Sequence, residues 1–318
     1  MEKNIKLVED CFRRARITGE LCDSSISKYK DSIKKFFSMI DRKINNLEVR
    51  DFEDFILKMR DNGASNSRIA NVISAVKWVI SNLQMNDMIK RTLDLEKVKK
   101  PKIERKEVEF LNDQEIEKLL GCISEDISKG ESVRKVRMMA LVILLLESGA
   151  RIGEALSIEI EKIDWDNKEI PIIGKGKMPR TLFFRDRSEY WLKKYLSIRN
   201  SDNEFLFVSQ QGFTKWSQTD VGRSFRRYRK LSGIKKKFVL HTLRHTTATQ
   251  LSFKGAQFNE IQTLLGHKRL ETTVKYYIGA ASKQKVKKIM QDKYYDFIPE
   301  SGLENRQVDK IAVETLTL

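Results

Sequence analysis

The stretch MMALVILLLESGARIGEAL, residues 138–156, contains the longest apolar run of the chain, the nine residues from Met138 to Leu146. A bilayer needs about 20 apolar residues, so a run of this length predicts a helix buried in a globular core. The helix is expected to end at Ser148-Gly149-Ala150, because glycine commonly terminates helices. Arg151 follows this turn directly. A single arginine after a glycine turn is usually a structural ion-pair residue. Whether Arg151 has a functional role must therefore be judged together with other residues of the sequence.

Charge is the strongest signal in the composition. Of 318 residues, 40% are hydrophobic and 33% are charged, as in soluble globular proteins, and the length favours two domains. The net charge is +17; residues 1–106 have 24 Lys and Arg against 16 Asp and Glu, which places +8 there and +9 in the remainder. Because both parts are basic, we expect nucleic acid as partner. A basic protein that is merely soluble is the alternative.

The N-terminus and the cysteines indicate where the protein is expected to act and whether it is expected to bind a metal. MEKNIKLVED, residues 1–10, has no apolar segment for export, so we expect a cytoplasmic protein without a membrane partner. Cys11, Cys22 and Cys122 form no CxxC pair, and the chain has only three histidines. The sequence also has no GxxxxGK[ST] motif. We therefore expect no metal site and no cofactor.

Before residue 100 the sequence shows helical patterns and no strand pattern. Apolar side chains recur with a period near 3.6 after the cap Asp23-Ser24-Ser25, over 49–59 and after Ser65, which predicts an all-helical domain at 1–94. The basic segment 95–110 predicts a linker, either simply solvated or also lying on phosphates. The lysines expected to make such DNA contacts are Lys97, Lys99, Lys100 and Lys102.

The remainder predicts helices around a small sheet. Asn112-Asp113-Gln114-Glu115 is a capping-box signal, and EIPIIGKGKMPRTLFF, residues 169–184, alternates β-formers around a glycine-containing turn. Helical segments return from about 186. The expected fold class is mainly α with a small antiparallel β-sheet, in an α+β catalytic domain at 111–296 followed by a tail at 297–318.

Six residues of the second domain have side chains that suit one kind of chemistry. They are Arg151, Lys175, His241, Arg244, His267 and Tyr276. His241 and Arg244 are three positions apart, so a helix places them on one face. Each of the six, taken singly, is better explained as structural.

Together and in this order, the six residues fit phosphoryl transfer on a phosphodiester. A pentacoordinate phosphorus gathers negative charge on its non-bridging oxygens, and two guanidiniums are fork-shaped donors for those oxygens. Lysine or histidine can protonate a departing sugar oxygen, and a tyrosine hydroxyl can attack phosphorus to form a phosphotyrosine. Such a set requires neither a metal nor a nucleotide.

Four motifs give the chain a resemblance to a known family. SGARIGEAL, IIGKGKMPR, HTLRHTTATQL and LLGHKRLETTVKYY, in this order over about 110–280, resemble the successive boxes of the tyrosine recombinases. This integrase family includes the Xer-like and Cre-like site-specific recombinases. The resemblance implies that the N-terminal helical domain is a SAM-like core-binding domain, which contacts DNA.

The resemblance also implies roles for the matching residues. Arg151 and Arg244 would clamp the phosphate, Glu154 would support Arg151, and His241 would assist proton transfer. His245 comes one position after Arg244, and we expect it to turn away from the face of His241 and Arg244 and to be structural.

The remaining roles fall on the hairpin and the C-terminal part. Lys175 would be the general acid for the leaving 5′ oxygen, with Lys177 in the same turn as the alternative. His267 would donate a hydrogen bond to the phosphate. Neighbouring helical positions point about 100° apart, so only one of Tyr276 and Tyr277 can face the phosphate. The family's spacing, nine residues after His267, selects Tyr276 as the nucleophile.

The family implies a reaction cycle and an assembly. Cleavage would leave a 3′-phosphotyrosine and a free 5′ hydroxyl, and two rounds of exchange would pass through a Holliday junction without ATP. A homo-tetramer would act on two specific double-stranded DNA sites, with or without accessory proteins. The tail at 297–318 would dock on a neighbouring protomer, or it is frayed. Integration or excision, dimer resolution and inversion all stay open as biological roles.

Three other functions are weighed against recombination. A type IB topoisomerase relaxes DNA without paired sites, a non-catalytic DNA-binding protein forms no covalent adduct, and a metal-dependent nuclease is stopped by EDTA. Each therefore differs from a recombinase in a measurable property.

Overall fold

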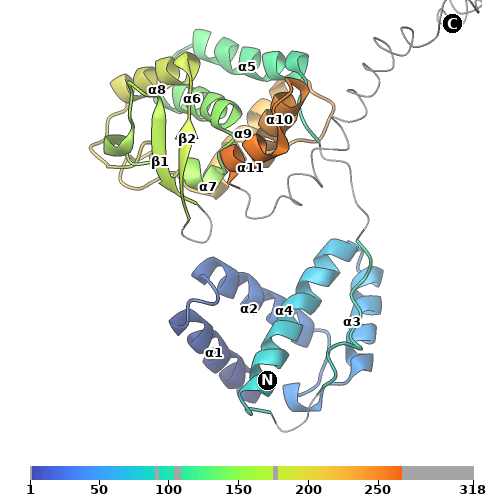
Figure 1. Ribbon diagram of the computed structural model, residues 1–318. Coiled ribbons are helices and arrows are strands. Elements are labelled where there is room, and N and C mark those ends of the chain that lie inside the picture. Colours follow the sequence, from blue (N-terminus) through green and yellow to red (C-terminus); the bar gives the residue numbers. More distant parts are fainter. Residues whose placement is uncertain (1, 90–92, 104–108, 175–177, 267–318) are drawn as a thin grey trace, which may run out of the picture. The chain divides into compact units, whose positions relative to one another are not determined.

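The structure of the chain, a computed structural model, describes residues 2–89, 93–103, 109–174 and 178–266. The chain divides into two compact units, Met1–Lys106 and Glu107–Leu318, each with its own hydrophobic core (Figure 1). Within the described ranges, no helix is long and apolar enough to cross a membrane. The same residues contain no group of three or more His, Cys, Asp or Glu side chains that could hold a metal ion.

The first unit is a bundle of helices. Its elements are α1 (Glu2–Ile17), α2 (Asp23–Phe37), a 3-10 turn (Ile44–Asn46), α3 (Val49–Asp61) and α4 (Asn66–Met85). Helix α4 packs against the other three, so it organises this core (Figure 1). It begins after Ser65, whose hydroxyl accepts a hydrogen bond from the backbone N–H of Arg68. That hydroxyl satisfies one of the N–H groups that a helix start leaves without an intrahelical partner.

The segment 93–103 packs along α4. Val98 is buried in the first core, and its carbonyl accepts a hydrogen bond from Lys77 Nζ at 3.1 Å. Lys100 Nζ lies 3.3 Å from the hydroxyl of Ser74. The first part of the expected linker is therefore attached to the helical unit, because one of its few apolar side chains completes that core.

The second unit surrounds one buried helix. Its elements are α5 (Asp113–Ser128), α6 (Val133–Ser148), α7 (Ile152–Ala155), a 3-10 turn (Ile160–Lys162), β1 (Glu169–Ile173), β2 (Pro179–Phe183), α8 (Asp186–Ile198), α9 (Gln218–Leu231), α10 (Leu240–Phe253) and α11 (Phe258–Leu265). Helix α6 packs against α5, α8 and α10 (Figure 1). Every residue from Val136 to Leu145 is buried. The apolar run is thus the buried core helix that the sequence predicted.

The two strands form the predicted antiparallel hairpin. Glu169 pairs with Phe183 and Ile173 with Pro179. Pro179 is the first residue of β2, a position where a missing N–H is tolerated. A mainly helical chain with a two-stranded antiparallel sheet confirms the expected fold class.

The exit of α6 determines where the following residues lie. Gly149 ends this helix with φ of 60°, in the left-handed region. A Cβ at this position would lie 2.8 Å from Cδ2 of Leu265, the last residue of α11. The turn after α6 therefore lies directly against the end of α11, and Arg151 follows at the start of α7.

Replacement of Gly149 by alanine is expected to lower the free energy of unfolding by about 1–3 kcal/mol, because the new methyl group combines backbone strain with a clash. Urea unfolding of the second unit measures this loss. Gly121→Ala is the control, since Gly121 lies inside α5 and an added Cβ meets nothing within 4 Å. There we expect a gain of about 0.5–1 kcal/mol. Equal effects of the two substitutions would contradict the close approach at Gly149.

Candidate active site

Arg151 stands at the first turn after the buried helix. Its backbone N–H donates to Glu154 Oε2 at 2.8 Å, and its Nη1 donates to Oε1 of the same carboxylate at 2.8 Å. Its Nη2 donates to the carbonyl of Gly266 at 3.3 Å. The side chain is still 28% exposed, so this guanidinium is anchored and yet accessible to a ligand.

Glu154 is a buried carboxylate held by two arginines. Its side chain is 6% exposed, and its Oε2 lies 2.6 Å from Nη2 of Arg180. Burial on its own raises the pKa of this carboxyl. The hydrogen bond from the Arg151 N–H, the charge of Arg180 and the side-chain bonds of both arginines outweigh burial and lower the pKa below its ordinary value. Glu154 is therefore ionised at neutral pH and compensates part of the two positive charges.

Arg244 lies inside the second unit, on α10. Its residue surface is 1% exposed, and its Nη1 and Nη2 donate to the carbonyls of Gly149 at 2.7 Å and Leu265 at 2.5 Å. These carbonyls stand at the C-terminal ends of α6 and α11. Carbonyls at a helix C-terminus lack intrahelical donors and carry partial negative charge, so a guanidinium suits them.

Three consecutive carbonyls at the end of α11 each accept a hydrogen bond from a different arginine. The pairs are Leu264 with Arg180, Leu265 with Arg244, and Gly266 with Arg151. The three arginines come from β2, α10 and the start of α7. Three guanidiniums thus converge on one helix end, immediately before His267 in the sequence.

His241 lies close to two of these arginines. Its side chain is exposed, yet the protein around the ring removes part of its hydration. This loss of hydration, together with the charges of Arg244 and Arg151, lowers the pKa of His241 below its ordinary value. His241 is therefore neutral at pH 7 and able to accept a proton.

His245 contacts His241, so the expectation that it turns away is wrong. The two ring centroids are 4.6 Å apart and the ring planes make an angle of 80°. Residues four apart on a helix are neighbours, and His245 follows His241 by four positions. Burial, followed by the charges of His241 and Arg244, lowers the pKa of His245 to about 4. This histidine is a neutral packing partner of His241.

Four residues that the sequence proposed for the site lie outside the described residues. They are Lys175, Lys177, His267 and Tyr276. The described chain nevertheless reaches the site on both sides. A Cβ on Gly174, the residue before Lys175, would lie 3.5 Å from Glu154 Oε1, and Gly266 contacts Arg151.

The lysines expected to contact DNA belong to the first unit. They are Lys97, Lys99, Lys100 and Lys102, and all four are exposed. Lys97 Nζ lies 3.4 Å from the carboxylate of Asp94. Burial and the charges of Lys100 and Lys99 lower the pKa of Lys77 on α4, which places these three cations near one another. We call Lys77, Lys99 and Lys100 the lysine cluster.

Arg180 is part of the constellation, and the sequence did not single it out. It ends the motif IIGKGKMPR and lies in the second strand of the predicted hairpin. A single arginine in a strand gives no sign of its partners, because Glu154 and Leu264 are 26 and 84 residues away in the sequence. Its place in the same motif as Lys175 is the only signal that could have found it.

Comparison with known proteins identifies the family. The family described as "Phage integrase family" matches residues 109–284. A tyrosine recombinase of Thermosipho africanus is 30% identical over 291 residues, which cover 90% of this chain and 98% of the relative. The chain belongs to the phage integrase family. It is a tyrosine recombinase, an enzyme of site-specific DNA breakage and rejoining, as the motifs predicted.

Other relatives of this recombinase agree in sequence and in fold. The tyrosine recombinase XerC of Thermodesulfovibrio yellowstonii is 31% identical over 265 residues, covering 80% of this chain and 86% of the relative. The XerH site-specific recombinase in a post-cleavage complex with a palindromic difH substrate has a TM-score of 0.69 at 22% identity, and the match covers 90% of this chain and 84% of that chain. At 22% identity, the match to the XerH structure supports the fold alone.

Replacement of His245 by glutamine is expected to weaken the dependence of stability on pH. The folded-state pKa of about 4 lies below the ordinary value of 6.5, so stability is full above pH 6.5 and is lost as the pH falls through 4. The variant lacks the imidazole, so between pH 7 and 4 its free energy of unfolding should fall by roughly 2–3 kcal/mol less than that of the wild type. Urea midpoints between pH 7 and 4 measure it. Parallel curves for the variant and the wild type would contradict the low pKa.

Proposed function

We propose that this recombinase exchanges strands at a specific double-stranded DNA site, with Tyr276 as nucleophile and with Arg151, Arg244 and His241 around the scissile phosphate. The observation that supports this most directly is that Arg151 and Arg244 bind adjacent carbonyls at the end of α11. Two guanidiniums so close together can donate to two non-bridging oxygens of one phosphate, where charge develops during transfer.

The two arginines differ in how a phosphate reaches them. Each terminal guanidinium nitrogen carries two hydrogens. Arg151 is partly exposed, so a phosphate oxygen can join its present acceptors. Arg244 is almost fully buried, so its contact with DNA requires the surrounding chain to move. In this mechanism Arg151 meets the phosphate first, and Arg244 completes the clamp.

The other groups move protons. In the proposed reaction His241, which is neutral, assists proton transfer, and Lys175 protonates the leaving 5′ oxygen, with Lys177 as the alternative acid. His267 donates a hydrogen bond to the phosphate. Attack by Tyr276 then leaves a 3′-phosphotyrosine, and its ester bond retains the energy needed for rejoining.

Specific DNA as the partner is supported by the structural relatives and by charge. The XerH structure contains a difH substrate, and a lambda integrase dimer was solved on a COC′ core site. This chain has a net charge of +17, and the lysine cluster holds like charges together on the first unit. We propose a homo-tetramer on two sites in the cytoplasm, with accessory proteins where a site demands them.

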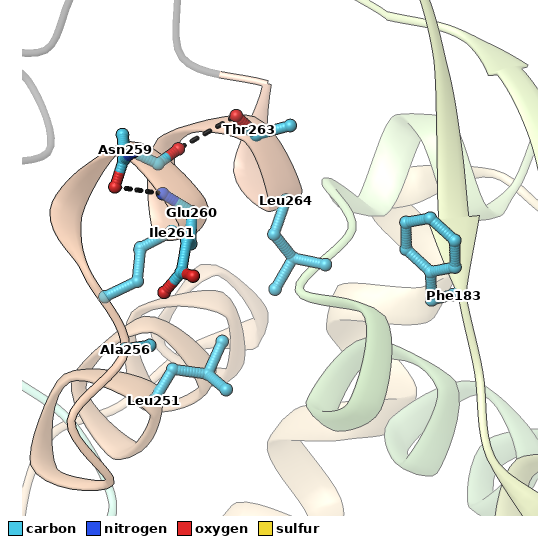
Figure 2. A pocket seen from close by; sticks show the side chains of 8 residues that line it. All are labelled: Phe183, Leu251, Ala256, Asn259, Glu260, Ile261, Thr263 and Leu264. Carbon is cyan, nitrogen blue, oxygen red and sulfur yellow. Dashed lines mark hydrogen bonds between the residues drawn. The ribbon is translucent and has the colours of Figure 1, made fainter.

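A hollow on the second unit suits the proposed docking of the C-terminal tail. It is lined by Phe183, Leu251, Ala256, Asn259, Glu260, Ile261, Thr263 and Leu264 (Figure 2). Most of these side chains are apolar, and so are many residues of the terminal sequence VDKIAVETLTL, residues 308–318. We propose that the tail of a neighbouring protomer covers this hollow. Because Leu264 also belongs to the helix end that the arginines hold, docking there would reach the active site.

Replacement of Tyr276 by phenylalanine is expected to abolish the covalent protein–DNA complex, because it removes the attacking oxygen. The complex is trapped on a library of nicked genomic DNA, detected by denaturing electrophoresis and sequenced at the bound ends. Tyr277→Phe is the matched control and should keep the adduct. EDTA should leave the yield unchanged. An adduct formed by Tyr276→Phe would remove the proposed nucleophile, and relaxation of supercoils by monomers would favour a topoisomerase.

Removal of two charges from the lysine cluster, in the double variant Lys99→Ala/Lys100→Ala, is expected to weaken DNA binding at all sequences. The slope of log K against log salt should become shallower by about 1.8, because each lost phosphate contact removes about 0.9. Lys129→Ala is the control, since Lys129 is exposed and bonded to Glu125 at 2.6 Å. An unchanged slope in the double variant would show that these lysines do not lie on phosphates.

A further inference from the structure

Arg180 connects three parts of the second unit. It comes from β2, its Nη2 lies 2.6 Å from Glu154 Oε2, and its Nη1 donates to the carbonyl of Leu264. The side chain is 10% exposed. Both terminal nitrogens therefore already serve partners in the protein, and their directions are fixed by the planar fork of the guanidinium.

The exit of α11 packs directly on this arginine. Gly266 has a φ of 61°, in the left-handed region, and a Cβ there would lie 2.7 Å from Cδ and 3.3 Å from Nε of Arg180. Arg180 Nε is buried and has no hydrogen-bond partner among the described residues. The backbone at Gly266 can adopt its present path only because no side chain separates it from the Arg180 stem.

Stability alone does not explain this arrangement. Desolvation makes a buried ion pair costly, and an apolar residue of similar volume often serves the fold equally well. Here the pair of Arg180 and Glu154 costs desolvation, and the Nε donor finds no partner within the part of the chain that the structure describes. What the arginine supplies instead is a fixed geometry between Glu154, which holds Arg151, and the end of α11, from which the chain continues to His267.

We infer that Arg180 is a positioning residue of the strand-cleavage reaction. It holds the Glu154 carboxylate against Arg151 and sets the direction in which the chain leaves α11 for His267. This inference rests on the proposed function, because it gives His267 and Arg151 their roles at the phosphate. In this role Arg180 acts through Glu154 and the end of α11, and makes no contact with the phosphate itself.

The test compares Arg180→Met with a matched buried arginine. Arg137 on α6 is 4% exposed, donates to the carbonyl of Val208 and lies 3.8 Å over the Trp216 ring, so Arg137→Met also removes a buried guanidinium. Single-turnover formation of the covalent complex on a nicked DNA site, the DNA dissociation constant and the melting temperature are measured for each variant.

Arg180→Met should cleave about 100-fold more slowly, as expected when reacting groups are misplaced by about 1 Å, with a dissociation constant close to wild type. Arg137→Met should melt earlier but cleave at the wild-type rate. Arg180→Lys, which keeps the charge but reaches only one of the two partners, should recover part of the rate. If Arg180→Met does not fold, Arg180→Lys and Gly266→Ala carry the test, and both should slow cleavage without weakening DNA binding.

A double-mutant cycle separates positioning from general damage. If Arg180 acts through His267, then Arg180→Met adds little to the defect of His267→Gln, because coupled residues are not additive. Multiplicative defects, or wild-type cleavage by Arg180→Met, would overturn the inference. Tyr276→Phe in the same assay distinguishes a failure of the role inferred for Arg180 from a failure of the proposed function. An adduct with Tyr276→Phe rejects the proposed function, whereas its absence beside a fully active Arg180→Met rejects only the role of Arg180.

Discussion

The active region depends on the convergence of three guanidiniums on the C-terminal end of α11. One buried carboxylate, that of Glu154, compensates part of their charge, and the partial negative charge of the helix end compensates another part. Arg244 donates to the carbonyls at two helix ends. The site thus keeps an excess of positive charge, and a phosphodiester is the kind of group that can neutralise it.

The backbone groups of this convergence come from the ends of helices. Gly149, which caps α6, supplies one carbonyl, and the last two residues of α11 with their cap Gly266 supply three more. Arg151 lies at the cap that precedes α7, whereas Glu154 of α7, Arg180 of β2 and Arg244 of α10 contribute side chains from within their elements. Helix ends have backbone groups without intrahelical partners, so they can bind arginines and hold them in place. Two left-handed glycines, Gly149 and Gly266, let these ends approach each other.

Local signals in the sequence predicted the fold and part of the site. The buried run, the hairpin and the capping box at Asn112 each depend on residues close in the chain, and the structure contains all three. Helix α1 was not predicted. From residue 7 onward, where its side chains are described, the buried ones are Val8, Cys11, Phe12 and Ala15. Two of these four are weakly apolar, so the helical period is faint.

Long-range contacts were harder to predict from the sequence. The burial of Val98, the role of Arg180 and the contact between the two histidines all depend on which surfaces meet after folding. Arg151, Glu154, His241 and Arg244 were found because the motifs contain them, and the structure brings them together. The places of Lys175, His267 and Tyr276 in the site stay predictions, because these residues lie outside the described part of the chain.

The separation of the two cores has a consequence for the origin of new specificities. The first core ends at Val98 and the second begins at Leu111, and no buried side chain of the described residues belongs to both. Exchange of the first unit for that of a relative would therefore leave no cavity in the catalytic core. Chimeras joined between these two residues would keep the catalytic core of one parent and take from the other the helical unit, with the DNA contacts proposed for its lysine cluster.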